Sequence, residues 1–215
     1  MTRAVFLDAL GTLVELEPPW EHLRSMVPEE VSDRRLVAAV RDEMAYYKAH
    51  AHEGRDAESL AELRERCAAV LSEALGADVS APELVDAVRM SAYPDAEPAL
   101  RELRGRGLSL VVVSNWDCSL ADVLRRCGLG SLLDGAVSSA EAGSRKPDPA
   151  IFASALELAG CDPDEALHVG DTAEEDVAGA RAAGIRVLLL ERDGAAGAGD
   201  GATRISSLSE IEEHL

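Results

Sequence analysis

Residues 6–13, with the sequence FLDALGTL, decide the fold of this chain. A short apolar run opens there into a glycine turn that carries a lone carboxylate, Asp8. Such a run, ended by glycine, predicts a buried strand whose carboxyl end presents Asp8. The residue two places further on is Leu10, so the turn lacks a second acid. That pattern limits the chemistry that Asp8 can perform.

Short β-branched or leucine-rich runs alternate with helical patterns along the rest of the chain. They predict strands near residues 3–7, 108–113, 135–137, 166–169 and 185–190. This alternation is typical of an α/β fold, in which a parallel sheet carries helices on both faces. The glycine- and alanine-rich stretch 193–202 predicts a flexible surface loop, followed by a short strand and a terminal helix.

The interval between the first two strands is too long for one crossover helix, so we expect an inserted domain. Residues 17–92 have helical patterns throughout and no strand signal. Ser32 or Asp33, Asp56 and Ser80 are plausible N-caps, and Ser80 with Glu83 predicts a capping box. The expected division is a sheet domain of residues 1–16 and 93–215 around a helical domain of residues 17–92.

Composition and charge exclude several classes of function. The chain has 215 residues, 47% of them apolar, which is enough for a hydrophobic core. Its 40 acidic and 21 basic residues give a net charge of −19, which argues against nucleic acid and against an anionic membrane as partners. No apolar run reaches the length of a membrane span or a signal segment.

The cysteines do not form a recognisable metal or redox motif. Cys67, Cys118, Cys127 and Cys161 include no CxxC pair and no histidine at metal-ligand spacing. We therefore expect a reduced, cytoplasmic protein.

Three further turns carry polar side chains beside predicted strands or helices. Ser114 and Asn115 follow the second strand, where a hydroxyl and free backbone N–H groups can bind an anion, although such residues are more often caps. Lys146, in the sequence SRKPDP, is held at a helix entrance; taken alone, it reads as a solvated lysine. Asp171 stands directly at the end of the fourth strand.

Ligands of a doubly wound sheet bind at the carboxyl ends of the strands. We therefore expect Asp8, Ser114 and Asp171 to converge if their strands are neighbours. Two crowded carboxylates repel each other and favour a cation between them. Hard oxygen ligands with few protein contacts suit Mg²⁺, which takes the rest of its shell from water and phosphate.

Together these four segments resemble the four motifs of the haloacid dehalogenase-like hydrolase superfamily, in their usual order and across the whole chain. The inserted helices resemble the C1 cap of that superfamily. The resemblance implies a Rossmann-like, doubly wound parallel sheet with strand order 5-4-1-2-3 and an all-helical cap domain that closes over the site.

The resemblance also implies roles for individual residues. Asp8 matches the nucleophile that becomes an aspartyl-phosphate, which water then hydrolyses. The groups that orient it or bind the phosphoryl oxygens would be Thr12, Ser114, Asn115 and Lys146. The Mg²⁺ contacts would be Asp8, the backbone carbonyl of Leu10, Asp171 and Asp176, the last as a direct ligand or as a support.

Leu10 departs from the phosphatase pattern, in which an aspartate commonly serves as general acid. Its loss penalises alkyl phosphates, since a positioned acid contributes roughly 10²- to 10⁴-fold in rate. Acyl phosphates, phosphoanhydrides and activated aryl phosphates lose little. The resemblance therefore implies a Mg²⁺-dependent phosphohydrolase that acts on a small phosphorylated metabolite, as a monomer or homodimer.

Two alternatives stay open. A 2-haloacid dehalogenase would use Asp8 to displace halide without magnesium, but such enzymes typically carry tyrosine in place of Leu10 and Ser-Ser-Asn near the sequence Gly-Asp-Thr of residues 170–172. Arg41 falls roughly where a halide-binding arginine would lie, although its charged surroundings favour a solvated side chain. A catalytically weak binding or regulatory protein is the other alternative.

Other polar residues have simpler interpretations. Trp20, His22, Arg24, Tyr46, Tyr47 and Lys48 are possible contacts of the cap with substrate, but packing or surface exposure is the more economical reading. His168 lies within a predicted buried strand and reads as a hydrogen-bonded core histidine.

Overall fold

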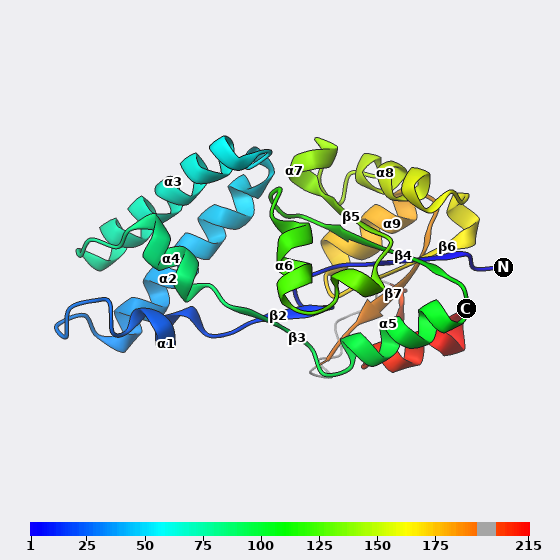
Figure 1. The fold of residues 1–215 in the computed structure, drawn as a ribbon, viewed down its shortest axis with the longest axis horizontal. Helices are drawn as coiled ribbons and strands as arrows, with labels where there is room; N and C mark the ends of the chain where they lie inside the picture. Colours follow the sequence, from blue (N-terminus) through cyan, green and yellow to red (C-terminus); the bar gives the residue numbers. More distant parts are fainter. Residues whose placement is uncertain (193–200) are drawn as a thin grey trace.

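The computed structural model describes residues 1–192 and 201–215. A sheet with helices on both sides forms one part of the molecule, and a group of helices forms the other (Figure 1). The glycine-rich stretch expected at 193–202 lies almost entirely outside the described residues. None of the helices in the described residues is long and apolar enough to cross a membrane.

Six strands of the described chain form one sheet in the order β5-β4-β1-β6-β7-β8, with every neighbouring pair parallel. The predicted order of the first five strands is confirmed, and β8 extends the sheet at one edge. The bounds are β1 Ala4–Leu7, β4 Ser109–Ser114, β5 Gly135–Ser138, β6 Ala166–Gly170, β7 Arg186–Leu190 and β8 Thr203–Ile205.

Strand β1 lies at the centre and is buried on both faces. Side chains alternate along a strand, so Val5 and Leu7 enter one apolar cluster while Ala4 and Phe6 enter another. The first cluster includes residues of α5 Ala96–Gly105, α6 Leu120–Arg126 and η5 Leu208–His214, and the second includes residues of α8 Ala150–Ala159 and α9 Ala178–Ala182. The doubly wound α/β architecture is therefore confirmed.

Short helical turns complete this part of the chain. They are η2 Gly130–Leu132, α7 Ser139–Ala142, η3 Pro163–Glu165 and the π-helical turn η4 Ala173–Val177. Helix α8 begins one residue later than the sequence SRKPDP indicated, since Pro149 is its N-cap. Asp148 still accepts a hydrogen bond from the Ala150 amide at 2.9 Å.

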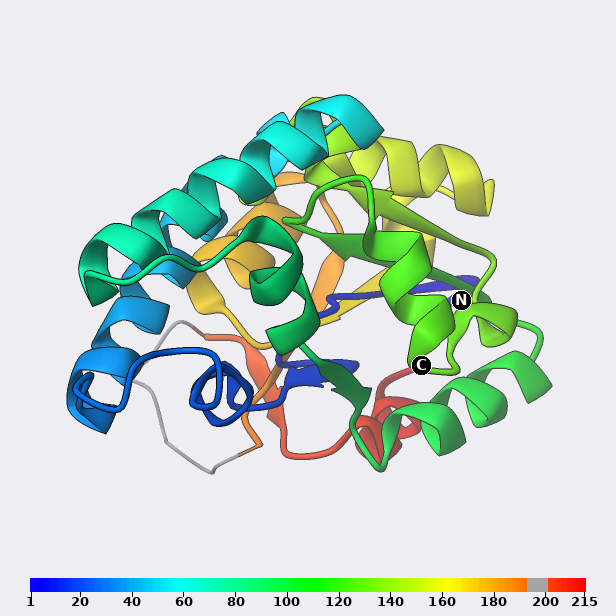
Figure 2. The same ribbon diagram turned by 60° about the vertical axis from the view of Figure 1, so that its left-hand side comes forward.

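The inserted helices pack around an apolar cluster of their own (Figure 2). They are α1 Pro19–Leu23, α2 Asp33–His50, η1 Ala51–Glu53, α3 Ala57–Leu75 and α4 Ala81–Ala87. Ser32, Asp56 and Ser80 cap α2, α3 and α4 as the sequence predicts, and the capping box of Ser80 with Glu83 is present. The bounds of the two expected domains stay a prediction.

The expectation that residues 17–92 contain no strand is wrong. Strand β3, Met90–Ala92, pairs antiparallel with β2, Val14–Leu16, where the chain enters and leaves the inserted helices (Figure 1). Three residues are too few to display an alternating pattern, and their hydrogen-bond partners lie far away in the sequence. Local sequence signals therefore did not reveal this ladder.

Candidate active site

The register of the sheet brings the predicted site residues to one edge. Leu7 pairs with Val112 of β4 and with Val169 of β6, so the chain segments after these three strands leave the sheet side by side. The Asp8 amide donates to the Val169 carbonyl at 2.9 Å, which fixes the first residue beyond β1. The expected convergence of Asp8, Ser114 and Asp171 follows from this register.

Lys146 lies between two carboxylates. Its Nζ is 2.7 Å from Asp8 Oδ1 and 2.5 Å from Asp176 Oδ1, and the residue is 1% exposed. Burial alone would lower the pKa of Lys146, but the two carboxylates outweigh it and hold that pKa above its ordinary value. The solvated lysine considered for this position is therefore excluded.

Asn115 holds the backbone of Lys146. Its Nδ2 donates to the Lys146 carbonyl at 3.0 Å, and its Oδ1 accepts from the Lys146 amide at 2.8 Å. Nδ2 also donates to Glu175 Oε2 at 2.9 Å. The side-chain amide thus positions the lysine, and only the backbone of Asn115 is left to serve the predicted anion site.

Asp176 is held by hydrogen bonds at both carboxylate oxygens. Oδ1 accepts from Lys146 Nζ and contacts His168 Nε2 at 2.8 Å, and Oδ2 accepts from the Thr172 amide at 3.0 Å. Burial would raise the pKa of Asp176, but Lys146 and His168 hold it below its ordinary value. His168 is the core histidine that the sequence predicts, although its contact with Asp176 was not foreseen.

Three carboxylates gather at the strand ends. Asp8, Asp171 and Asp176 each offer an oxygen within 4.8 Å of the other two. Burial, together with the charges of Asp8 and Asp176, raises the pKa of Asp171 to about 6. Burial also raises the pKa of Asp8, against the opposing effect of Lys146. Such a set of crowded oxygen ligands suits a divalent cation, which would relieve the repulsion.

Two glycines allow this crowding. Gly11 has φ +83°, and a Cβ on it would lie 2.2 Å from Asp171 Oδ2. A Cβ on Gly170 would lie 2.1 Å from the carboxyl carbon of Asp176. Any side chain at either position would therefore displace a carboxylate of the cluster.

The remaining predicted residues lie around Asp8. Ser114 is buried, and its hydroxyl, like Lys146, opposes the rise that burial causes in the pKa of Asp8. Thr12 is fully buried, and its hydroxyl has no hydrogen-bond partner among residues 1–192 and 201–215. Leu10 is 38% exposed and faces a cavity. Its side chain has no proton to donate.

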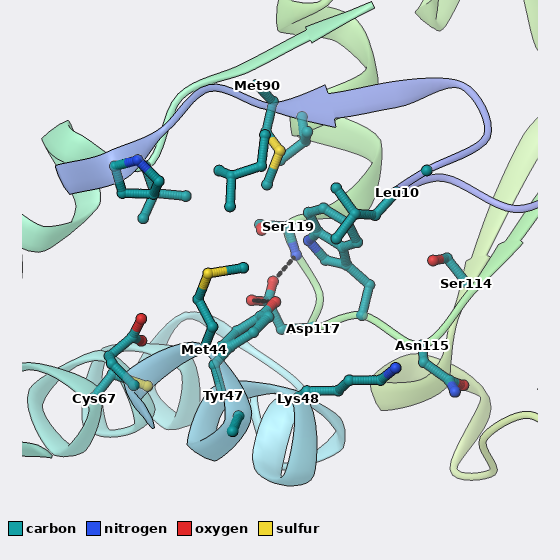
Figure 3. Close-up of a pocket in the computed structure, with 18 of the residues that line it drawn as sticks. Leu10, Met44, Tyr47, Lys48, Cys67, Met90, Ser114, Asn115, Asp117 and Ser119 are labelled. Carbon is teal, nitrogen blue, oxygen red and sulfur yellow. Dashed lines mark hydrogen bonds between the residues drawn. The ribbon is translucent and has the colours of Figure 1, made fainter. Parts of the chain in front are cut away.

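A cavity of about 440 Å³ separates the strand ends from the cap helices. Asp8, Ser114 and Asp171 line it at the sheet, and helices α2, α3 and α4 line the far side. Figure 3 shows Met44 and Met90 facing the same space from opposite sides. A cavity of this size, lined by apolar side chains with a few carboxylates at one end, is suited to bind a small molecule.

Two residues of the inserted helices, for which the sequence favoured packing or surface exposure, instead lie in the wall of this cavity. Tyr47 donates from its hydroxyl to Asp117 Oδ2 at 2.8 Å, which joins α2 to the turn after β4. Lys48 forms an ion pair with Glu175 at 3.5 Å. Burial raises the pKa of the Tyr47 hydroxyl well above its usual value, so this phenol keeps its proton.

Trp20, His22, Arg24 and Arg41 lie in packed or surface positions, as the sequence predicts. Trp20 packs on the apolar cluster of the inserted helices, and His22 contacts Glu17 at 3.3 Å. Arg24 donates to the carbonyl of Val31 at 2.5 Å. Arg41 is exposed.

The sequence reading overlooked Glu43, which is 6% exposed and lines the cavity. Burial raises its pKa to about 7. Glu43 stands in a run of charged residues, Arg41-Asp42-Glu43, whose composition gave no reason to single it out. The helical period of α2, read against the apolar Leu36, Ala39 and Val40, is the one signal that pointed to its burial.

Comparison with known proteins gives one consistent family. The profile described as "Hydrolase: haloacid dehalogenase-like hydrolase" matches residues 2–184. The haloacid dehalogenase-like hydrolase domain-containing protein 3 of Bos taurus is 41% identical over 122 residues, which cover 57% of this chain and 47% of that protein. The phosphoserine phosphatase of Thermus thermophilus is 41% identical over 128 residues, which cover 57% of this chain and 51% of that protein.

The match thus spans about half the length of these curated relatives. Among solved structures, a 2-haloacid dehalogenase of Pseudomonas syringae is similar over 99% of this chain and 97% of its own, with a TM-score of 0.67 and 27% identity.

Proposed function

This chain belongs to the haloacid dehalogenase-like hydrolases, and on that premise we propose that it hydrolyses a small phosphorylated metabolite through an aspartyl-phosphate on Asp8. The observation that carries the proposal is the placement of Lys146, whose ammonium lies 2.7 Å from the carboxylate of Asp8, a residue that lines the cavity. A buried cation beside a nucleophilic carboxylate is suited to bind the oxygens of a phosphoryl group. The relative named as a phosphoserine phosphatase supports the same class of reaction.

In the first step an Asp8 oxygen attacks phosphorus, and the leaving-group oxygen departs with the electrons of the broken P–O bond. Lys146 and the Ser114 hydroxyl bind phosphoryl oxygens. The Thr12 hydroxyl makes no hydrogen bond to Asp8 among the described residues, so its assignment to orienting that carboxylate rests on the family resemblance. In the second step water attacks the aspartyl-phosphate, which releases inorganic phosphate and restores Asp8.

The carboxylate cluster fits Mg²⁺, which we propose as the cofactor. Asp8, Asp171 and the Leu10 carbonyl would hold it. Asp176 accepts hydrogen bonds at both oxygens, which favours its role as a support over a role as direct ligand. When bound, the ion would supply positive charge to the phosphoryl oxygens and to the crowded carboxylates.

Leu10 limits the leaving group. The side chain at this position faces the cavity but cannot protonate a departing alkoxide. We therefore propose that the enzyme prefers phosphates whose leaving groups depart as stable anions, such as acyl and aryl phosphates. The four free thiols support a cytoplasmic location, and a monomer or homodimer stays the expected assembly.

The test is release of phosphate from acetyl phosphate, p-nitrophenyl phosphate and several alkyl phosphates, with and without Mg²⁺. We expect release that depends on Mg²⁺, is lost in Asp8→Asn, and favours the better leaving groups. Trapping of BeF₃⁻ on Asp8, followed by fluorine NMR, tests the nucleophile independently. Absence of both turnover and trapping in folded protein would leave a catalytically weak binding protein.

Dehalogenation is the second candidate, because the 2-haloacid dehalogenase of Pseudomonas syringae has the same fold and this cavity is largely apolar. Three clustered carboxylates argue against it, since displacement of halide needs no metal. Release of halide from 2-chloropropionate in EDTA would establish dehalogenation in place of phosphate chemistry.

A further inference from the structure

The wall of the cavity contains a section that no step of phosphate hydrolysis explains. Beyond Asp8 the cavity passes between the core and the inserted helices. We call this section the apolar chamber; its wall includes Leu10, Met44, Leu84, Val88, Met90 and Trp116. Figure 3 shows Leu10, Met44 and Met90 around this space. Burial of a ligand's apolar surface against such a wall is favourable. The same wall offers few hydrogen-bond partners for sugar hydroxyls.

One carboxyl interrupts this wall. Glu43 comes from α2, is 6% exposed and lines the cavity. The Cys67 thiol donates a hydrogen bond to it, which is a weak interaction. Burial raises the pKa of Glu43 to about 7. A carboxyl in such surroundings is costly unless a cation or strong donor meets it.

The cations that share the cavity do not pair with Glu43. Lys48 forms its ion pair with Glu175, and its side chain is 62% exposed. Arg64 and Arg126 also line the cavity. None of the ion pairs within residues 1–192 and 201–215 includes Glu43. The chamber therefore holds a buried carboxyl that has no ion pair within the described residues.

We propose that the apolar chamber binds a leaving group that is apolar along its length and ends in a protonated amine, which pairs with Glu43. This inference rests on the proposed phosphatase function and names its substrate class. The phosphoryl group lies at Asp8 and Lys146, the apolar segment lies against Met44 and Met90, and the ammonium replaces the missing partner of Glu43. The net charge of −19 favours such a cationic end over an anionic one.

A matched series of substrates tests this assignment. Phenyl phosphates with a 4-(ω-aminoalkyl) chain of one to four methylenes are compared with 4-alkylphenyl phosphates of equal length. Each pair is assayed with wild-type enzyme, with Glu43→Gln and with Asp42→Asn. The glutamine keeps the size of the Glu43 side chain without its charge, and Asp42 is an exposed carboxylate of the same helix. The ratio of kcat/KM within a pair cancels the effect of folding or of active-enzyme fraction.

We expect wild-type enzyme to favour the amine at one chain length by at least about tenfold, as a charge-assisted hydrogen bond provides. Glu43→Gln should lose this preference, chiefly through KM, while Asp42→Asn keeps it. An unchanged preference in Glu43→Gln, or a preference for the alkyl chain at every length, would overturn the inference and leave the proposed function standing.

Direct binding separates this inference from the proposed function. Phenylalkylamines of the same chain lengths are titrated calorimetrically into wild-type protein and Glu43→Gln. If no phosphate ester is hydrolysed, saturable binding that weakens at least about tenfold in Glu43→Gln still supports the chamber as an amine site. Equal binding by the two proteins, or no binding by either, would overturn the assignment.

Discussion

The strand-end site and the apolar chamber lie in one cavity but treat their charges differently. At the strand ends Lys146 contacts both Asp8 and Asp176, and His168 also contacts Asp176. In the chamber Glu43 is buried without an ion pair among the described residues. Asp171 also has no ion pair among the described residues and its pKa is raised to about 6, but unlike Glu43 it is exposed.

The difference distinguishes carboxylates that the protein itself neutralises from carboxylates that a ligand would neutralise. Lys146 already pairs with Asp8, the proposed nucleophile, so that part of the site is preformed. In the proposed function, Asp171 would receive a metal ion and Glu43 would receive the amine of the substrate. Variants at the strand ends should therefore affect every substrate alike, whereas variants in the chamber should change the preference among substrates.

The largest effect is expected for Asp8→Asn. An amide cannot form the aspartyl-phosphate, so turnover of every phosphate ester should fall at least about 10⁴-fold, whatever the leaving group. Steady-state phosphate release with acyl, aryl and alkyl phosphates measures this, with Asp42→Asn as control. A loss confined to some leaving groups would mean that the nucleophile lies elsewhere.

Leu10→Asp should introduce the general acid that this position lacks, and so tests the strand-end site by a gain of activity. We expect hydrolysis of alkyl phosphates to rise by about 10²- to 10⁴-fold, with little gain for acetyl phosphate. The matched control is Leu10→Asn, which has nearly the same shape but no ionisable proton. An equal gain in both variants would show that polarity, and not proton donation, limits the enzyme.

The strand-end site was largely predictable because sheet geometry determines it. Asp8, Ser114 and Asp171 each follow a buried strand or end one, and the carboxyl ends of neighbouring parallel strands meet at one edge. The burial of Lys146 was less evident, since the turn SRKPDP alone also fits an exposed lysine. Its contacts depend on Asn115, whose two hydrogen bonds to the Lys146 backbone no spacing rule reveals.

The chamber was not predictable for the opposite reason. Its wall combines side chains from α2, β3 and the α4 region with Leu10 and Trp116, and these segments, distant in the sequence, come together only when the chain packs. Asp42 and Glu43 are adjacent carboxylates in one helix, yet one is exposed and the other buried. Charge patterning describes both as a solvated face. Local patterns therefore locate the chemistry in this fold more readily than the specificity.

Lys146 at the strand ends and Lys48 in the wall of the cavity provide a matched test of how much each ion pair stabilises the fold. In metal-free protein, Lys146→Met leaves Asp8 and Asp176 buried without their cation, which should lower the free energy of unfolding by about 3–5 kcal/mol. Lys48→Met removes an ion pair whose lysine is largely exposed, and should cost less than about 1 kcal/mol. Urea denaturation in EDTA measures both. Equal costs would contradict the view that Lys146 is the central cation of a preformed site.

The smallest expected effect concerns Glu43 and depends on pH. Burial raises the pKa of Glu43 from 4.5 to about 7, so the unfolded chain releases this proton more readily than the folded one. The folded state is then penalised as the pH rises from about 4.5 through 7, and the penalty reaches its full value above 7. A glutamine in place of Glu43 has no such proton to lose.

The variant Glu43→Gln should therefore be more stable than wild type at pH 8, by at most about 3 kcal/mol from a shift of this size. Its advantage should shrink as the pH falls toward 4.5, where the folded wild-type protein keeps this carboxyl protonated. Urea unfolding of ligand-free protein between pH 4.5 and 8 measures the difference, with Asp42→Asn as the control that should follow wild type. If the difference in free energy of unfolding between the variant and wild type stays constant over this range, the pKa of Glu43 is not raised by burial. An amine ligand should remove the stability advantage of Glu43→Gln at pH 8. The ammonium supplies a counter-charge to Glu43 in the wild-type protein, whereas the neutral glutamine of the variant gains nothing from it.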